Sequence, residues 1–138
     1  MRARAREKQK KKIIIPFYFA VSIIFYIFAG RIKMDTAKVL RKDEALNLVR
    51  RYKEVIAPRF NGEAKVYMFG SYSRGKARPD SDIDVAVIVP SFGDNWWLWT
   101  KSLWRDVRKV STLIEPVLME EESHSPLYDD VMRTGVAV

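Results

Sequence analysis

The hydrophobic pattern from residue 43 onward predicts helices and strands in turn. Residues 43–57 carry apolar side chains at the spacing of one helix face, and Asp43 is a suitable N-cap for that helix. Residues 66–69 form a short apolar run whose side chains can alternate between the two faces of a strand. Residues 83–89 form a second such run, broken only by Asp84. We therefore expect a helix followed by two strands.

Aromatic side chains mark the next predicted helix, over residues 95–110. Its core face is expected to carry Trp96, Trp99, Leu103, Val107 and Val110. Trp97 and Trp104 are seven residues apart on a neighbouring face. They either widen the buried stripe or form an exposed aromatic patch that contacts a partner protein.

A third strand is predicted over residues 113–119, with Glu115 in its middle. Pro116 cannot donate a hydrogen bond to a ladder, so this strand is expected at a sheet edge or at a bulge. Glu115 is either an edge charge that blocks aggregation or a carboxylate within reach of the second strand. The elements together predict an α/β (α+β) fold, a small mixed sheet with helices packed on it.

Residues 1–33 differ from the rest of the chain. Seven Lys and Arg side chains precede an uncharged run of eighteen residues, 13–30, which predicts one apolar N-terminal helix. Three accounts stay open: a membrane anchor, a secretion signal, or a true start at Met34 with the leader absent. We expect a leader over 1–33 and one domain over 34–138. The protein is cytoplasmic if translation starts at Met34 and membrane-anchored if the leader is real.

The net charge of +8 is confined to this leader. Residues 1–33 hold nine Lys and Arg and one acid, which leaves 16 basic and 16 acidic residues in 34–138. The predicted domain is therefore neutral and gives no strong signal for nucleic-acid binding. The chain has no cysteine, which excludes disulfides and thiolate metal sites.

Two acids at the head of the second predicted strand are the main candidates for chemistry. Asp82 and Asp84 are two residues apart, so both carboxylates project from the same face of one strand. Like charges so placed repel each other. Mg²⁺ would remove that cost, because it takes oxygen ligands and usually binds one or two carboxylates together with substrate phosphates.

The turn after the first predicted strand suggests a place for those phosphates. Gly70 lets the backbone approach a ligand closely, and the N–H groups of a short helix expected over 71–78 favour anions. Ser71 is suited to that helix start as a phosphate contact, as an N-cap, or as both. Arg74 either contacts a phosphate or pairs with a nearby acid.

Gly70-Ser71, ten further residues and then Asp82-Ile83-Asp84 resemble the signature of the nucleotidyltransferase superfamily that shares its fold with DNA polymerase β. The fuller string GSYSRG…SDIDVAV is similar to the minimal nucleotidyltransferases (MNT-type proteins) of bacteria and archaea. The resemblance covers residues 43–138. It implies Mg²⁺, one or two ions, with ATP or another nucleoside triphosphate as substrate. Its implied phosphate-binding residues are Gly70, Ser71 and Arg74, and its implied metal-binding and catalytic residues are Asp82, Asp84 and Glu115.

The resemblance also implies an acceptor. MNT-type proteins are often antitoxins that transfer AMP to a tyrosine of a toxin with a HEPN domain, encoded nearby. A protein acceptor suits this chain, because residues 34–138 leave no room for a separate substrate-binding domain. The alternative is a non-catalytic binding module that neutralises or regulates a partner by contact, with a membrane tether if residues 13–30 are an anchor.

Overall fold

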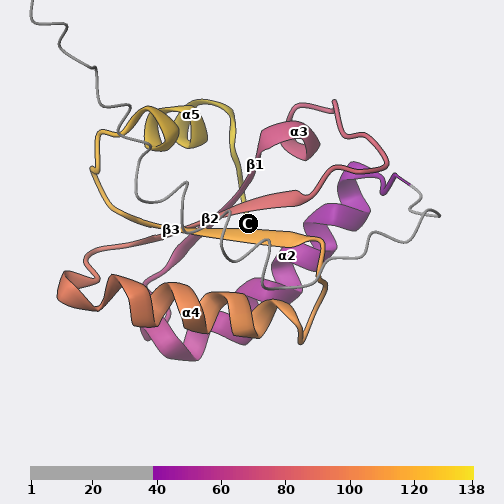
Figure 1. The fold of residues 1–138 in the computed structure, drawn as a ribbon. Coiled ribbons are helices and arrows are strands. Elements are labelled where there is room, and N and C mark those ends of the chain that lie inside the picture. Colours follow the sequence, from indigo (N-terminus) through magenta and orange to yellow (C-terminus); the bar gives the residue numbers. More distant parts are fainter. Residues whose placement is uncertain (1–38) are drawn as a thin grey trace, which may run out of the picture. The chain divides into compact units, whose positions relative to one another are not determined.

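The computed structural model describes residues 39–138, and one mixed sheet organises them (Figure 1). The strands are β1 (Lys65–Phe69), β2 (Ile83–Val89), β3 (Ile114–Glu120) and β4 (Val136–Ala137), in the order β3-β2-β1-β4. β1 pairs antiparallel with β2 and with β4, whereas β2 and β3 are parallel. Parallel neighbours need a crossover connection, and α4 (Trp96–Val107) supplies it. The predicted fold class is confirmed.

Helices cover both faces of this sheet. They are α2 (Lys42–Ile56), the 3₁₀ turn η1 (Ala57–Phe60), α3 (Gly70–Ser73), the 3₁₀ turn η2 (Gly93–Asn95), α4, and α5 (Pro126–Thr134). Figure 1 shows α2 and α4 on one side of the sheet and α3 and α5 on the other. The larger core lies on the α2 and α4 side, because Val85 and Val87 pack there, whereas Ala86 and Ile88 join a smaller cluster with Val131 of α5.

The start of α2 differs from the prediction. Arg41, not Asp43, is the N-cap, and Asp43 lies in the first turn. The Arg41 N–H donates to Oε2 of Glu44 at 2.7 Å, so a side chain three residues ahead satisfies the open end of the helix. Asp43 still stabilises the helix from its new place, because an acidic side chain in the first turn complements the helix dipole.

The aromatic face of α4 is only partly core. Leu103 and Val107 are buried as predicted, and Trp96 and Trp99 pack against the larger core. Trp97, however, is 47% exposed, so the interpretation of a wide buried stripe is wrong at this position. The stripe stays narrow because the sheet reaches only one face of the helix.

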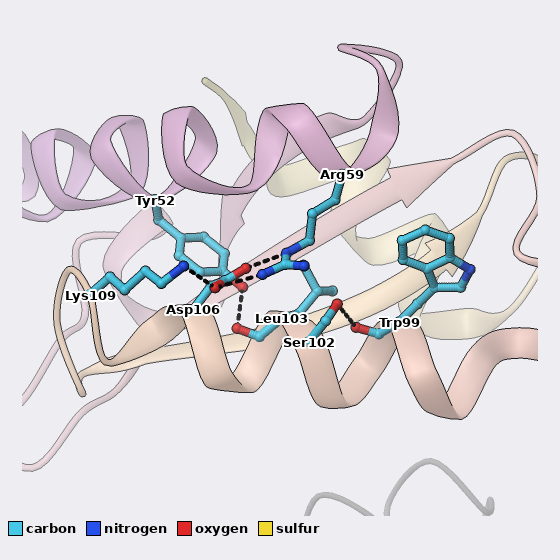
Figure 2. Close-up of polar contacts among 7 residues, drawn as sticks. All are labelled: Tyr52, Arg59, Trp99, Ser102, Leu103, Asp106 and Lys109. Carbon is cyan, nitrogen blue, oxygen red and sulfur yellow. Dashed lines mark hydrogen bonds and ion pairs between the residues drawn. The ribbon is translucent and has the colours of Figure 1, made fainter.

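A buried ion pair joins η1 to α4, and Figure 2 shows it. Asp106 is fully buried, and its Oδ2 accepts a hydrogen bond from Nε of Arg59 at 2.5 Å. Its Oδ1 accepts from Nη2 of Arg59 at 3.0 Å and lies 2.8 Å from Nζ of Lys109. Beside this pair the Tyr52 hydroxyl donates to the Leu103 carbonyl at 2.9 Å, which joins α2 to α4. These contacts hold the helical layer together beneath the sheet.

Burial raises the pKa of Asp106, but the hydrogen bonds and charges of Arg59 and Lys109 outweigh it, and the pKa lies below the ordinary value of 3.8. The carboxylate is therefore ionised and paired at neutral pH. The same contacts raise the pKa of the Arg59 guanidinium.

The leader, residues 1–33, lies outside the described residues, and the division at residue 34 stays a prediction. Across 39–138 no helix has the length and apolar content that a bilayer crossing needs. β3 does lie at the edge of the described sheet, where the sequence placed a strand interrupted by Pro116.

Candidate functional site

The sheet brings the predicted acids to one end of its α5-side face. Asp84 is the second residue of β2, and its neighbour Ile83 points to the larger core, so Asp84 projects to the opposite face. Across the ladders it stands opposite Phe69 of β1 and Glu115 of β3. Neighbouring strands lie about 4.8 Å apart, which makes Glu115 the adjacent residue on this face. Asp82 comes two residues before Asp84, immediately ahead of the strand.

Gly70 lies directly against Asp84. The chain leaves β1 at Gly70 with a φ of +72°, a conformation that other L-residues rarely adopt. A Cβ built on Gly70 would collide with Oδ2 of Asp84. The turn and the acid are therefore in contact, and glycine is required both by the backbone and by the space. The pattern of a glycine turn and a carboxylate pair, separated along the chain, becomes one site in three dimensions.

The electrostatics of Asp84 reflect this crowding. Burial, followed by the negative charge of Asp82, raises the pKa of Asp84 from 3.8 to about 6, while the positive charge of Arg74 acts in the lowering direction. The ionised pair is thus costly in the fold itself. An electrostatic cost of this kind is typical of functional sites, where a charge is kept for its chemistry although it lowers stability.

The phosphate-binding candidates lie around α3. Ser71 is partly buried in this short helix, and its carbonyl accepts a hydrogen bond from the N–H of Lys76 at 2.9 Å. The predicted helix over 71–78 is shorter than expected, because α3 ends at Ser73 and a turn follows. Arg74 caps α3 and forms an ion pair with Asp130 of α5, with 2.6 Å between Nη2 and Oδ2.

The donor set fits Mg²⁺ when a nucleotide completes it. Within residues 39–138 no group of three or more His, Cys, Asp or Glu side chains is arranged to hold a metal ion by itself. Mg²⁺, however, usually takes one or two carboxylates and fills its octahedron with phosphates and water. Asp82 and Asp84 provide that pair of carboxylates, and the cost of ionising Asp84 beside Asp82 is the cost that a cation relieves.

We expect Gly70→Ala to disturb the site and not merely the turn. The new Cβ must displace the Asp84 carboxylate, and the positive φ adds strain of about 1–3 kcal/mol. Nucleotidyl transfer should fall about 10- to 100-fold, as expected for a shift of about 1 Å at a reacting centre. Steady-state kinetics and urea unfolding of the variant measure both effects.

Gly75→Ala is the matched control for that substitution. Gly75 also has a positive φ, +68°, but a Cβ there would meet nothing within 4 Å. It should lower the free energy of unfolding by a similar backbone cost and leave transfer nearly unchanged. Equal kinetic losses in the two variants would contradict a specific contact between Gly70 and Asp84.

We expect Asp84→Asn to stabilise the metal-free protein at neutral pH. The folded pKa of about 6 lies above the ordinary 3.8, so between these values the folded state binds more protons than the unfolded state. The stability contributed by Asp84 is therefore present at low pH and is lost as the pH rises through 6. Asparagine removes that loss. In EDTA, the melting temperature of wild type should fall relative to that of Asp84→Asn as the pH rises from 4 to 7.5. Parallel pH profiles for the two proteins would contradict a raised pKa of Asp84.

One contact in the site has no sequence signal. Pairing with an acid is one of the two roles that the sequence left open for Arg74, but the acid itself, Asp130, lies 56 residues away, and no local pattern identifies it. The burial of Asp106 is also not predicted by the sequence, because the predicted core face of α4 is defined by apolar side chains.

Comparison with known proteins agrees with this geometry. Residues 49–132, more than half of the chain, match the family model described as nucleotidyltransferase domain. A protein of Methanocaldococcus jannaschii, provisionally named a protein adenylyltransferase, is 27% identical over 99 residues, which cover 69% of this chain and 99% of that protein.

Two solved structures are also similar. A provisionally assigned nucleotidyltransferase from Sulfolobus solfataricus superposes with a TM-score of 0.53 at 21% identity, over 74% of this chain and 89% of that one, which supports the fold. A toxin–antitoxin structure with AMP-PNP has a TM-score of 0.40 at 24% identity, over 71% and 72% of the two chains, a likeness too weak to argue from.

The range matched by the family model spans the residues that form the candidate site. It includes β1, the Gly70 turn, β2 with its two acids, and β3 with Glu115. The resemblance seen in the sequence is thereby confirmed, and the chain is a nucleotidyltransferase by family. The protein belongs to the nucleotidyltransferase domain family.

Proposed function

We propose that this chain transfers a nucleoside monophosphate, AMP in particular, from a nucleoside triphosphate to a hydroxyl group of a partner protein. The observation that supports this most is the contact between the Gly70 turn and Asp84, with Asp82 adding its charge to the same place. A backbone turn pressed against paired carboxylates suits a triphosphate held between N–H groups and a metal ion.

In this proposal Asp82 and Asp84 hold Mg²⁺, with Glu115 beside them on β3. The ion, when bound, supplies charge neutralisation to the triphosphate. The backbone at Gly70 and the hydroxyl of Ser71 bind the β- and γ-phosphates. Phosphoryl-type transfer asks little covalent chemistry of a protein, so these residues act by aligning the substrate and by stabilising charge.

The bond changes are simple to state. The acceptor oxygen forms a bond to the α-phosphorus, and the bond from that phosphorus to the bridging oxygen breaks and releases pyrophosphate. Glu115 accepts the hydroxyl proton, because it is the carboxylate next to Asp84 on the neighbouring strand. Positioning of the acceptor comes from the binding energy of the partner protein.

A tyrosine of a HEPN-domain toxin is the acceptor that we propose. Support comes from the relative named as a protein adenylyltransferase, 99% of which aligns with this chain, and from the resemblance to MNT-type antitoxins. Residues 39–138 carry equal numbers of acidic and basic side chains, which suits a protein acceptor better than a nucleic acid.

Labelled nucleotide tests the proposal. The full chain is incubated with Mg²⁺ and α-labelled ATP, GTP, CTP or UTP, and with the purified product of a neighbouring gene or a lysate of the source organism. We expect label from ATP on one protein band, and tryptic mass spectrometry should place it on a tyrosine. Binding of the partner with no label from any nucleotide would contradict the enzyme proposal and support a module that acts by contact.

A further inference from the structure

The contact between Arg74 and Asp130 joins the phosphate-binding turn to the C-terminal helix. Nη2 of Arg74 donates to Oδ2 of Asp130 at 2.6 Å, across the gap between α3 and α5. The other carboxylate oxygen, Oδ1, accepts from Nη2 of Arg133 at 2.8 Å. Asp130 thus faces Arg74 from a fixed place on α5, with one oxygen committed to each arginine.

The two partners differ in how firmly they are held. Asp130 belongs to a regular helix turn, where Oγ1 of Thr134 donates to its carbonyl at 2.8 Å, and only 25% of its side chain is exposed. The Arg74 side chain is 42% exposed and long, with about 2 kcal/mol of rotamer entropy to lose when it is fixed. Asp130 is therefore the anchor, and Arg74 is the group that it orients.

Stability does not account for this pair. Solvent-exposed ion pairs contribute only about 0–1 kcal/mol to folding, because side-chain entropy and screening offset the attraction. The contact instead fixes the orientation of the Arg74 guanidinium. It uses one of the five N–H donors of the guanidinium and leaves four for an anion. The same guanidinium is close enough to Asp84 for its charge to act on that carboxylate.

We propose that Asp130 is a positioning residue, which holds the Arg74 guanidinium near the Asp84 carboxylate so that it binds the triphosphate of the nucleotide. The inference rests on the proposed function in taking a nucleoside triphosphate as the ligand. It assigns a role to α5, which lies outside the turn and the acid pair.

We expect Asp130→Asn to weaken binding of ATP and of inorganic tripolyphosphate roughly three- to tenfold, the cost of ordering one side chain at the moment of binding. Arg74→Ala should weaken it at least as much. In the Arg74→Ala background, the Asp130 substitution should have no further effect, because it acts only through Arg74. Calorimetry with the full chain, with and without Mg²⁺, measures these constants without any transfer step.

Asp129→Asn is the matched control. It removes the same charge from the neighbouring residue of α5, whose side chain is exposed. Its affinity for tripolyphosphate should equal that of wild type, and its melting temperature should fall only slightly, because Asp129 lies in the first turn of α5. A general electrostatic effect of α5 would move both variants alike, whereas positioning moves only Asp130→Asn.

The outcomes separate this inference from the proposed function. Weakened binding in Asp130→Asn, absent in the Arg74→Ala background, supports the inference even if no nucleotide is ever transferred. Binding that is unchanged or tighter in Asp130→Asn overturns it, since the pair would then be idle or would compete with phosphate. Additive losses in the double variant overturn it also. A wild-type chain that neither binds ATP nor transfers label overturns both proposals.

Discussion

Replacing both acids, Asp82→Asn and Asp84→Asn, should reduce nucleotidyl transfer by about a thousandfold or more while the fold persists. Each substitution removes a charged oxygen ligand, and the loss of one preorganised group at a developing charge already costs about 10²–10³ in rate. The fold should persist because the ionised Asp84 is unfavourable in the free protein, with a pKa raised to about 6. Label from α-labelled ATP and a far-ultraviolet circular dichroism melt measure the two effects.

A double substitution elsewhere provides the control. Asp94→Asn with Asp129→Asn removes the same net charge from exposed positions outside β2. It should leave transfer within a few-fold of wild type. If the Asp82 and Asp84 variant kept most of its activity, the acids at the head of β2 would not hold the metal, and the assignment of the site would be wrong.

Arg59→Met should destabilise the fold by about 3 kcal/mol, a large part of the total stability of a small domain. The substitution leaves the fully buried Asp106 carboxylate without its bidentate partner and with only the exposed Lys109 beside it, and removing one partner from a buried ion pair is costly. Denaturation by urea at pH 7 measures the change. Transfer activity at a temperature where the variant is folded should be close to wild type, because the pair lies under the opposite face of the sheet.

Lys109→Met is the comparison for that prediction. Lys109 contacts the same carboxylate at 2.8 Å, but its side chain is 58% exposed, so its loss should cost no more than about 1 kcal/mol.

The stability that the Arg59–Asp106 pair contributes should depend on pH. The folded pKa of Asp106 is lowered, so the stability from the pair is present above the ordinary value of 3.8 and is lost as the pH falls through the folded pKa. The advantage of wild type over Arg59→Met should shrink in acid, and a constant difference would argue against the ion pair as its source.

Features that depend only on residues close together in the sequence were predictable from the sequence alone. The strands β1 and β2, the turn at Gly70 and the spacing of Asp82 and Asp84 follow from apolar runs, a glycine and a period of two. These rules are local because they reflect sterics and side-chain alternation within a few residues. The candidate site could therefore be outlined from the sequence.

Boundaries and exposure were harder to predict because they depend on what packs against each element. Asp43 has the right chemistry for an N-cap, yet Arg41 occupies that position, since the Glu44 carboxylate satisfies the N–H there. The helical spacing left Trp97 either in a wide buried stripe or in an exposed patch, and it is 47% exposed because only one face of α4 meets the sheet. Neither outcome is visible in propensity or periodicity.

Local pattern therefore established the elements, the glycine turn and the carboxylate pair, whose chemistry is contained in residues close together in the chain. Only the tertiary structure placed Glu115 beside Asp84, through the parallel register of β2 and β3. It alone joined Arg74 to Asp130 over 56 residues and Arg59 to Asp106 over 47. The physical reason is that ion pairs and strand register depend on distances in the folded structure. The packing of the core sets those distances, and separation along the chain does not.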